Sequence, residues 1–385
     1  MRIAYFTDTF RPEINGVTNT LEYLSAYLAA RNTQHLFFAP DYGGNLTPVK
    51  EENVLRFPGV PPFVSPSSRL AFPSGRAVRS AVRDFRPDLI HITSELGVGM
   101  SGLQAARSLG IPVVMSYHTN FDRYFAFYYA RLLDLPYWTY MKWFHSFAAV
   151  NLCPSKSTLG ELRGRGMGSL DVWSRGVDLL RFSPRLRSGG VRDSLGGRDK
   201  FIFLYVGRIA REKGLDVLAR ALREVHARMG ERARFVFTGD GPYLREMTAM
   251  DLPNTVFTGF KQGAELAEIY ASADAFVFPS GTETLGNVLL EAMASGLPSV
   301  CADSGGVTDF AFHMENAYVA GYESASSLAR GMLELASNPL LRRRLGEGGL
   351  ETARSRSWTG VFDSLMLQYR AVLDGCAPEQ GRVAV

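Results

Sequence analysis

Two carboxylates stand in the stretch from Phe278 to Val300, at a spacing that suits the recognition of sugar hydroxyls. Glu283 comes just before an expected helix that begins at about Leu285, and Glu291 lies about two turns inside that helix. Carboxylates accept hydrogen bonds from vicinal hydroxyls, and the unpaired amides at a helix N-terminus favour phosphate. These amides belong to Leu285, Gly286, Asn287 and Val288. The stretch therefore favours a ligand that contains a sugar, a diphosphate and a ribose in series.

Both acids also have an interpretation that needs no ligand. Glu283 then caps the expected helix, and Glu291 is a solvated surface charge. The spacing alone leaves the two interpretations open.

Two cations form a second candidate cluster. Arg208 follows the expected strand Phe201–Gly207 directly, and Lys213 comes five residues later, before the expected helix Gly214–Met229. Cations at the carboxyl end of a parallel strand would neutralise a leaving diphosphate. The alternative is a solvated turn that binds no ligand. The position of Arg208 and Lys213 just beyond a central strand favours the diphosphate site.

The first half of the chain offers two candidates near strand ends. Gly16 is expected in a loop after the strand Arg2–Thr7, where a glycine lets the backbone approach a phosphate, and Thr18 or Asn19 is expected to cap the next helix. His118 ends the strand Pro112–His118, so its ring can reach a cleft shared with Glu283. A packed or solvated ring is the alternative for His118.

Two classes of site are disfavoured. The loop around Gly16 is not GxGxxG, and no acidic residue closes a second strand, which argues against a nicotinamide-dependent dehydrogenase. The histidines have no partners at metal-ligand spacing, so no metal is expected.

Aromatic residues crowd the segment 117–147, which holds 13 of the 45 in the chain. Cations are interleaved with them, a mixture that suits a membrane interface. A helix pair packed in the core explains the aromatics equally well. The residues assigned here to the acceptor or the membrane are Arg123, Tyr124, Arg131, Trp138, Lys142 and Trp143.

The elements that must position these residues alternate between strands and helices, which predicts parallel sheets in two doubly wound α/β domains. A linker rich in Gly, Pro and Arg separates the domains, expected at 1–180 and 181–360. Ligands bind beyond the carboxyl ends of such sheets, so two facing domains would enclose a cleft. The expected strands are Arg2–Thr7, Gln34–Ala39, Asn53–Phe57, Asp88–Thr93, Pro112–His118, Ala149–Pro154, Asp171–Arg175, Phe201–Gly207, Arg234–Gly239, Thr255–Gly259, Ala275–Pro279, Ser299–Ala302 and Ala317–Val319.

Composition limits the class of protein. The chain has 385 residues, with 42 basic and 38 acidic side chains, and the resulting charge of +4 is too small to indicate a nucleic-acid binder. Residues 1–180 contain 18 basic and 14 acidic side chains, so the whole excess lies there. Three distant cysteines and the lack of a long apolar run predict a cytoplasmic protein that meets a membrane only at its surface.

Taken together, these motifs resemble glycosyltransferase family 4. The resemblance rests on GVTNTLEYL, SYHTNFDRY, GVDLLRF, GRIAREKGLD and PSGTETLGNVLLEAMASGLPSV, and it runs from Met1 to about Trp358. Within the family, NGVTNT and HTNFD are most similar to α-mannosyltransferases that act on phosphatidylinositol or glycolipids, and to sulfoquinovosyl and glucosyl diacylglycerol synthases.

The resemblance implies the GT-B fold, retention of configuration, no bound metal and no cofactor beyond the nucleotide-sugar co-substrate. Arg208 and Lys213 would hold the diphosphate, Glu283 the hexose and Glu291 the ribose, with the Leu285–Val288 amides on the phosphate. His118 would contact the sugar near the new bond, and Gly16 would let the first loop close over the diphosphate. The helix 361–374 would pack back on the first domain.

The expected function is transfer of a hexose from GDP-mannose or a UDP-hexose to a lipid or glycolipid acceptor, at the inner face of the cell membrane. A soluble sugar acceptor, a nucleotide-sugar epimerase on the same fold, and a non-catalytic nucleotide-sugar-binding protein at the membrane are the alternatives.

Overall fold

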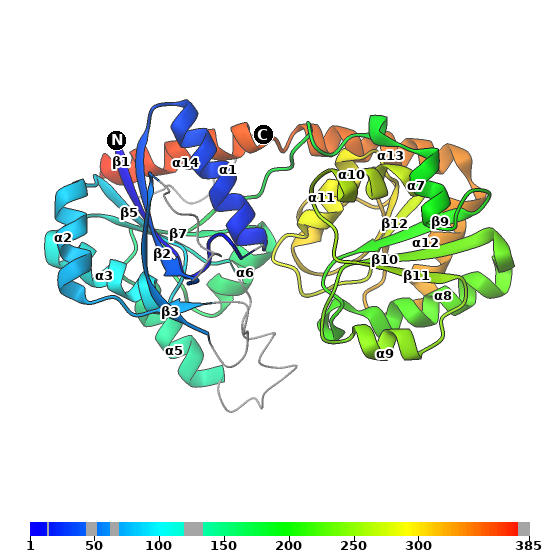
Figure 1. Cartoon of the computed structure of the whole chain (residues 1–385), viewed down its shortest axis with the longest axis horizontal. Helices are drawn as coiled ribbons and strands as arrows, with labels where there is room; N and C mark the ends of the chain where they lie inside the picture. Colours follow the sequence, from blue (N-terminus) through cyan, green and yellow to red (C-terminus); the bar gives the residue numbers. More distant parts are fainter. Residues whose placement is uncertain (14, 44–51, 62–68, 119–133, 376–385) are drawn as a thin grey trace. The chain divides into compact units, whose positions relative to one another are not determined.

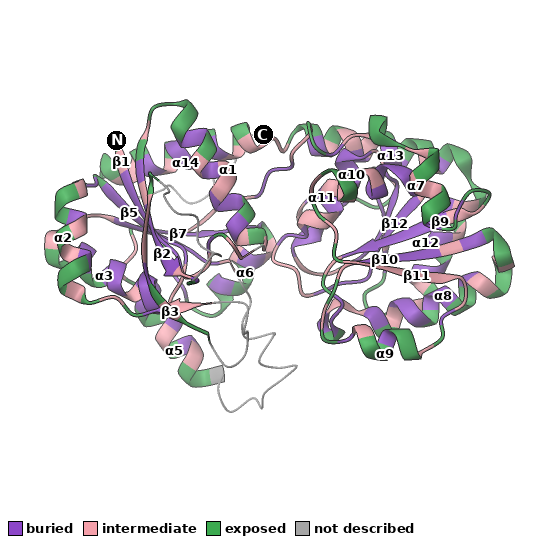
Figure 2. Ribbon diagram, viewed as in Figure 1, coloured by how far each residue is buried: buried purple, intermediate pink, exposed green. Residues whose placement is uncertain are grey.

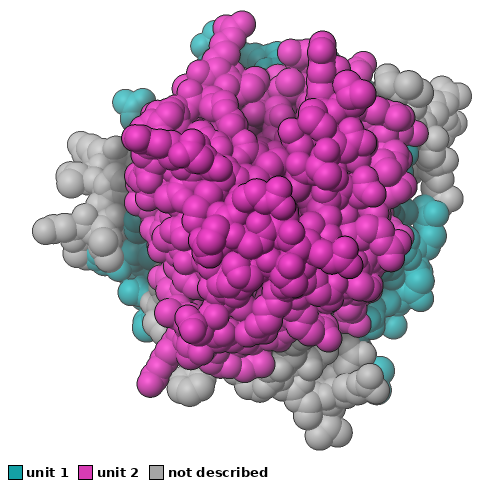
Figure 3. All heavy atoms as spheres, turned by 90° about the vertical axis from the view of Figure 1, so that its right-hand side faces the viewer, with its two compact units in different colours: residues 1–174, 359–385 teal, residues 175–358 magenta. Residues whose placement is uncertain are grey.

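The chain forms two compact units, which Figure 3 colours separately. The computed structural model describes residues 1–13, 15–43, 52–61, 69–118 and 134–375. Unit 1 comprises residues 1–174 and 359–385, and unit 2 comprises residues 175–358. The division after residue 174 precedes the expected boundary at 180, because Val177 bridges to Ser357 inside unit 2.

Unit 1 is built on a sheet with the strand order β4-β3-β2-β1-β5-β6-β7-β8 (Figure 1). All pairs are parallel except β3 with β4. The strands are short and apolar, as expected for a sheet buried on both faces, and Figure 2 shows most of them as buried. Their bounds are β1 Arg2–Phe6, β2 Gln34–Asp41, β3 Val54–Val60, β4 Leu70–Ala71, β5 Leu89–Ile92, β6 Val113–Ser116, β7 Val150–Cys153 and β8 Leu170–Val172.

The last helix in the described part of the chain belongs mostly to unit 1. Tyr369 of this helix is fully buried, with its hydroxyl 2.5 Å from His91 Nδ1 and 3.3 Å from the Tyr5 hydroxyl. His91 Nε2 lies 2.5 Å from Ser116 Oγ, so the network joins three neighbouring strands to the helix. The helices of unit 1 are α1 Gly16–Ala30, α2 Gly75–Phe85, α3 Gly97–Leu109, α5 Asp134–His145, α6 Lys156–Gly164 and α14 Trp358–Leu373.

Unit 2 has a parallel sheet with the order β11-β10-β9-β12-β13-β14. β9 reads FIFLYV and is buried over nearly its whole length, which is typical of a central parallel strand. The bounds are β9 Phe201–Val206, β10 Ala233–Thr238, β11 Thr255–Gly259, β12 Ala275–Phe278, β13 Ser299–Ala302 and β14 Tyr318–Ala320.

Helices cover the sheet of unit 2. In α8 the buried apolar residues recur three and four apart, at Leu215, Leu218, Leu222 and Val225, and they form one face against the core. The α-helices are α7 Gly189–Ser194, α8 Leu215–Met229, α9 Leu244–Ala249, α10 Gly263–Ser272, α11 Asn287–Ala294, α12 Ala325–Ser337 and α13 Pro339–Arg354. Short 3-10 turns are η3 Pro184–Leu186, η4 Arg211–Lys213, η5 Gly230–Arg232 and η6 Gly305–Asp309. No helix in the described part of either unit is long and apolar enough to span a bilayer.

Two local predictions for unit 1 need correction. Gly16 is the first residue of α1 rather than a loop residue, because Asn15 caps this helix by accepting from the amides of Val17 and Thr18. The sequence reading also missed β4, whose two residues are too few to show a pattern.

We expect Tyr369→Phe to lower the free energy of unfolding by about 1–3 kcal/mol, because it removes a hydrogen-bond partner from buried His91 and Tyr5. Leu367→Ala on the same helix is the matched control, since Leu367 is 63% exposed and surface truncations change stability by about 0.5 kcal/mol or less. Thermal and urea unfolding measure both variants. Equal effects of the two variants would show that the buried network contributes nothing.

Candidate active site

The strand order of unit 2 reverses between β9 and β12. From β9 the chain continues to β10 and β11 on one side, and from β12 it continues to β13 and β14 on the other. At such a reversal the connections diverge and leave a crevice beyond the carboxyl ends, where α/β proteins bind ligands. Arg208 and Lys213 follow β9, and Glu283 follows β12, so the topology places all three at this reversal.

Lys213 and Glu283 are in direct contact. Lys213 Nζ lies 2.6 Å from Glu283 Oε1, and the side chains are only 13% and 21% exposed. Ser280 Oγ donates to the same oxygen at 3.2 Å. The structure therefore places side by side two residues that the sequence assigned to one site. The carboxylate of Glu283 contacts Lys213 and Ser280, and no side chain caps α11, so the capping interpretation of Glu283 is wrong.

A glycine brings the two loops together. Gly214 has a φ of +70°, and a Cβ on it would lie 2.7 Å from the carbonyl oxygen of Pro279, the residue that follows β12. Only glycine combines this conformation with so close an approach. Its neighbour Lys213 therefore reaches Glu283.

Arg208 has a different environment. Its side chain is 50% exposed, and Nη1 lies 3.8 Å from Oε1 of Glu212, whose side chain is 1% exposed. The Tyr205 hydroxyl donates to the Arg208 carbonyl at 3.0 Å and fixes the backbone. The sequence reading did not single out Glu212, because the segment Arg211–Lys213 looks like a solvated turn.

Helix α11 begins later than predicted. Its first residue is Asn287, and Gly286 precedes it with a φ of +96°. A Cβ on Gly286 would lie 2.6 Å from Val307 Cγ1, so glycine is required here as well. The predicted start at Leu285 was therefore wrong, and only Asn287 and Val288 contribute amides from inside the helix.

Glu291 lies about one turn into α11 rather than two, as a result of this later start. Its Oε2 accepts a hydrogen bond of 3.0 Å from the buried Tyr270 hydroxyl, which also lies 3.2 Å from the Val288 carbonyl. Burial raises the pKa of Glu291 to about 7, although the Tyr270 hydrogen bond and the charge of Arg181 oppose the shift. Glu291 is therefore not the solvated surface charge of the alternative interpretation.

Unit 1 has its own strand reversal, between β1 and β5. Asp8 follows β1, and its Oδ1 accepts from the Val98 amide at 2.8 Å. Burial raises the pKa of Asp8 to about 8, the Val98 hydrogen bond opposes the shift, and the nearby charge of Glu95 adds to it. The sequence reading missed Asp8 and Glu95, although their places directly after two strands were a usable signal.

His118 lies two residues beyond β6, which ends at Ser116 rather than at the expected His118. Its ring is partly buried, with its centroid 5.7 Å from that of buried Trp173. His118 and Gly16 belong to unit 1, and the diphosphate and sugar candidates belong to unit 2.

The aromatic segment divides between core and surface where the structure describes it. Trp138 is 6% exposed and packs with Tyr117 and Met141 in the core, so its assignment to the acceptor or the membrane was wrong. Lys142 is exposed and Trp143 is 45% exposed on the same helix, α5. Arg123, Tyr124 and Arg131 lie outside the described residues.

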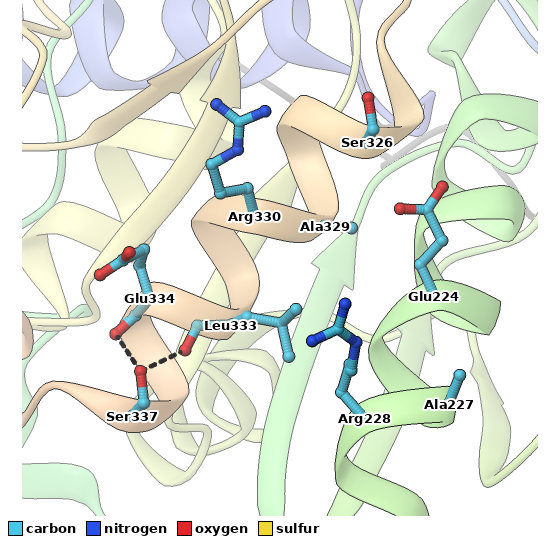
Figure 4. Close-up of a pocket in the computed structure, with 9 residues that line it drawn as sticks. All are labelled: Glu224, Ala227, Arg228, Ser326, Ala329, Arg330, Leu333, Glu334 and Ser337. Carbon is cyan, nitrogen blue, oxygen red and sulfur yellow. Dashed lines mark hydrogen bonds between the residues drawn. The ribbon is translucent and has the colours of Figure 1, made fainter.

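A groove of about 510 Å³ lies between α8 and α12 (Figure 4). It is lined by Arg228 and Glu224 from α8, and by Arg330 and Glu334 from α12. Arg228 lies 13 residues after the start of α8, or about 20 Å along the helix. The groove is therefore remote from Lys213 and Glu283.

Glu291 should make the stability of unit 2 depend on pH. Its carboxyl binds a proton more tightly in the folded state, with a pKa of about 7, than at its ordinary value of 4.5. The stabilisation from this proton is complete below pH 4.5 and is lost as the pH rises through 7.

We expect Glu291→Gln to be more stable than the parent at pH 8, by about 1 to 3 kcal/mol, and to lose less stability than the parent between pH 5 and pH 8. Urea unfolding at the two values measures this. Glu265→Gln, an exposed carboxylate on α10, is the control. A parent and variant with parallel pH profiles would contradict the raised pKa.

Comparisons with known proteins bear on this geometry. The family model Glycosyltransferase Family 4 matches residues 14–181, and Glycosyl transferases group 1 matches residues 192–352. The chain is 33% identical over 383 residues to a GDP-mannose-dependent alpha-mannosyltransferase of Mycobacterium tuberculosis, with 97% of each chain covered. It is 28% identical to an alpha-monoglucosyldiacylglycerol synthase of Streptococcus pneumoniae, over 78% of this chain and 70% of that one.

Among solved structures, the sucrose-phosphate synthase of Thermosynechococcus elongatus superposes with a TM-score of 0.78 and 19% identity, covering 97% of this chain and 99% of that one. This likeness confirms the expected GT-B fold with its two Rossmann-like domains. The two family models and the mannosyltransferase, aligned over nearly the whole length, identify the family. The chain belongs to glycosyltransferase family 4 and is a hexosyltransferase with the GT-B fold.

Proposed function

We propose that this enzyme transfers a hexose from a nucleoside-diphosphate sugar, with GDP-mannose as the first donor to test and UDP-hexoses as the alternatives, to a lipid or glycolipid acceptor. The observation that carries the donor site is the contact of Lys213 with Glu283 at the strand reversal of unit 2. The name of the mycobacterial relative supports GDP-mannose, and the name of the streptococcal relative supports a diacylglycerol-based acceptor.

Each group of the proposed donor site has a separate task. Arg208 and Lys213 neutralise the diphosphate as it leaves, and the first amides of α11 bind a phosphate oxygen. Glu283 accepts a hydrogen bond from a hexose hydroxyl, and Glu291 accepts from the ribose. Because Lys213 carries three N–H donors, it can keep Glu283 in place while it binds the diphosphate.

Transfer is proposed to proceed with retention and without a bound metal. The bond from the anomeric carbon to the phosphate oxygen breaks, and the acceptor oxygen bonds to that carbon on the same face. The leaving phosphate takes the acceptor proton. The two cations hold the charge that develops on the diphosphate, and His118 is proposed to contact the sugar near the new bond.

The acceptor is assigned to unit 1 and to the cytoplasmic face of a membrane. Arg76, Arg79 and Arg83 are spaced three and four residues apart, so they follow one side of α2, while Val78 and Val82 are buried on a different side. Phe72, just before this helix, is 70% exposed. A cationic helix with an exposed aromatic beside it suits an anionic lipid surface.

We expect Lys213→Ala and Glu283→Ala each to lower donor turnover about a hundredfold, the usual cost of one transition-state contact. Lys200→Ala is the control, because Lys200 pairs with Glu231 just before β9, at the opposite end of the strand. Release of the nucleoside diphosphate, measured with GDP-mannose and UDP-glucose in the presence of a lipid extract, gives the rates. Turnover within threefold of the parent in both variants would overturn the donor site.

Sedimentation with anionic vesicles tests the membrane assignment. Replacing Arg76, Arg79 and Arg83 by Ser should reduce binding at low salt at least fivefold, since each cation near such a surface contributes about 1 kcal/mol. Replacing Arg220, Arg228 and Arg330 of unit 2 by Ser removes the same charge and should leave binding within twofold. A parent that stays in the supernatant, or equal losses in the two variants, would contradict the assignment.

A further inference from the structure

Glu212 is a buried carboxylate in the loop that carries both cations of the proposed donor site. It lies in η4, beside Lys213, and its side chain is 1% exposed. A buried charge loses its hydration, and a carboxylate near a diphosphate also repels it. An apolar residue of similar volume often replaces a buried charge without loss of stability. The burial of Glu212 in this loop therefore indicates that Glu212 serves the site and is not there for packing.

The contacts of Glu212 connect it to both loops of the site. Its Oε1 lies 3.8 Å from Nη1 of Arg208, within the range of an ion pair and longer than a hydrogen bond. Its backbone carbonyl accepts from Thr282 Oγ1 at 3.2 Å, and Thr282 precedes Glu283. The carboxylate of Glu212 is thus buried, and the backbone of Glu212 is fixed by Thr282. The guanidinium of Arg208, by contrast, is half exposed.

Tyr205, at the end of β9, is close enough to both carboxylates to be affected by their charges. Burial raises its pKa well above the ordinary range, and the charges of Glu283 and Glu212 raise it further. The two carboxylates therefore act on the same hydroxyl from the ends of β12 and β9. The hydroxyl in turn donates to the carbonyl of Arg208.

We propose that Glu212 is a positioning residue for Arg208, an inference that rests on the proposed function. A planar guanidinium binds two partners along different edges. The buried carboxylate attracts one edge of Arg208, so that another edge faces the diphosphate. Without the Glu212 carboxylate, Arg208 keeps its charge and its length, but its guanidinium loses its preferred orientation. Misdirection of this kind lowers the rate of transfer more than the affinity for the nucleotide.

The experiment is a double-mutant cycle on the full chain with Glu212→Gln, Arg208→Ala and the double variant. Glu246→Gln is the matched control, because Glu246 pairs with Arg211 of the same turn and both side chains are about half exposed. The turnover number is measured from nucleoside-diphosphate release, and the affinities for GDP and UDP are measured by calorimetry.

We expect Glu212→Gln to lower the turnover number about tenfold and to weaken nucleotide binding less than threefold. Glu246→Gln should change both values less than twofold. In the Arg208→Ala background the additional effect of Glu212→Gln should fall below twofold, because the residue it acts through is gone.

An equal effect of Glu212→Gln in both backgrounds would show that Glu212 does not act through Arg208 and would overturn the proposal. So would a Glu212→Gln variant that behaves like Glu246→Gln. If Glu212→Gln does not fold, Glu212→Asp keeps the charge on a shorter side chain. That variant should retain nucleotide binding with reduced turnover, and parental turnover would contradict the proposal. A parent that neither binds GDP or UDP nor releases either would instead overturn the proposed function, and this inference with it.

Discussion

The candidate site depends on a constraint of parallel sheets: the carboxyl ends of neighbouring strands meet at one edge. In unit 2 the chain leaves β9 and β12 in opposite directions, so no connection crosses the space beyond them. The two loops then approach so closely that Gly214 touches the carbonyl of Pro279. The polar contacts that join the two loops, Lys213 with Glu283 and Thr282 with Glu212, follow from this approach.

The charges of the site are arranged in pairs. Lys213 faces Glu283, and Arg208 faces Glu212, so two cations and two carboxylates stand together. Such a site does not attract a diphosphate by net charge. In the proposed function the site would select the anion by direction, because the carboxylates hold each cation where a phosphate oxygen can reach it. The same pairing explains why Lys213 and Arg208 can be partly buried without a ligand, because each positive charge has a carboxylate beside it.

Much of this arrangement was predictable from the sequence. The strands of unit 2 are apolar and bounded by glycines or prolines, so their predicted bounds were nearly right. The ends of these strands led directly to Arg208, Lys213 and Glu283. The start of α11 was not predictable, because it depends on the left-handed conformation of Gly286 against Val307, a tertiary contact. Glu212 was missed and Trp138 was misassigned for a related reason: a charged turn looks solvated and an aromatic helix looks interfacial until burial is known.

The return of α14 to unit 1 has a consequence for the order of folding. Tyr5 and Tyr369 are 364 residues apart in the chain, so the first unit begins synthesis and is completed only after the second has left the ribosome. Unit 2 is continuous and can fold as soon as it emerges. The amino-terminal sheet therefore cannot acquire its contacts with α14 until the segment that forms unit 2 has been synthesised.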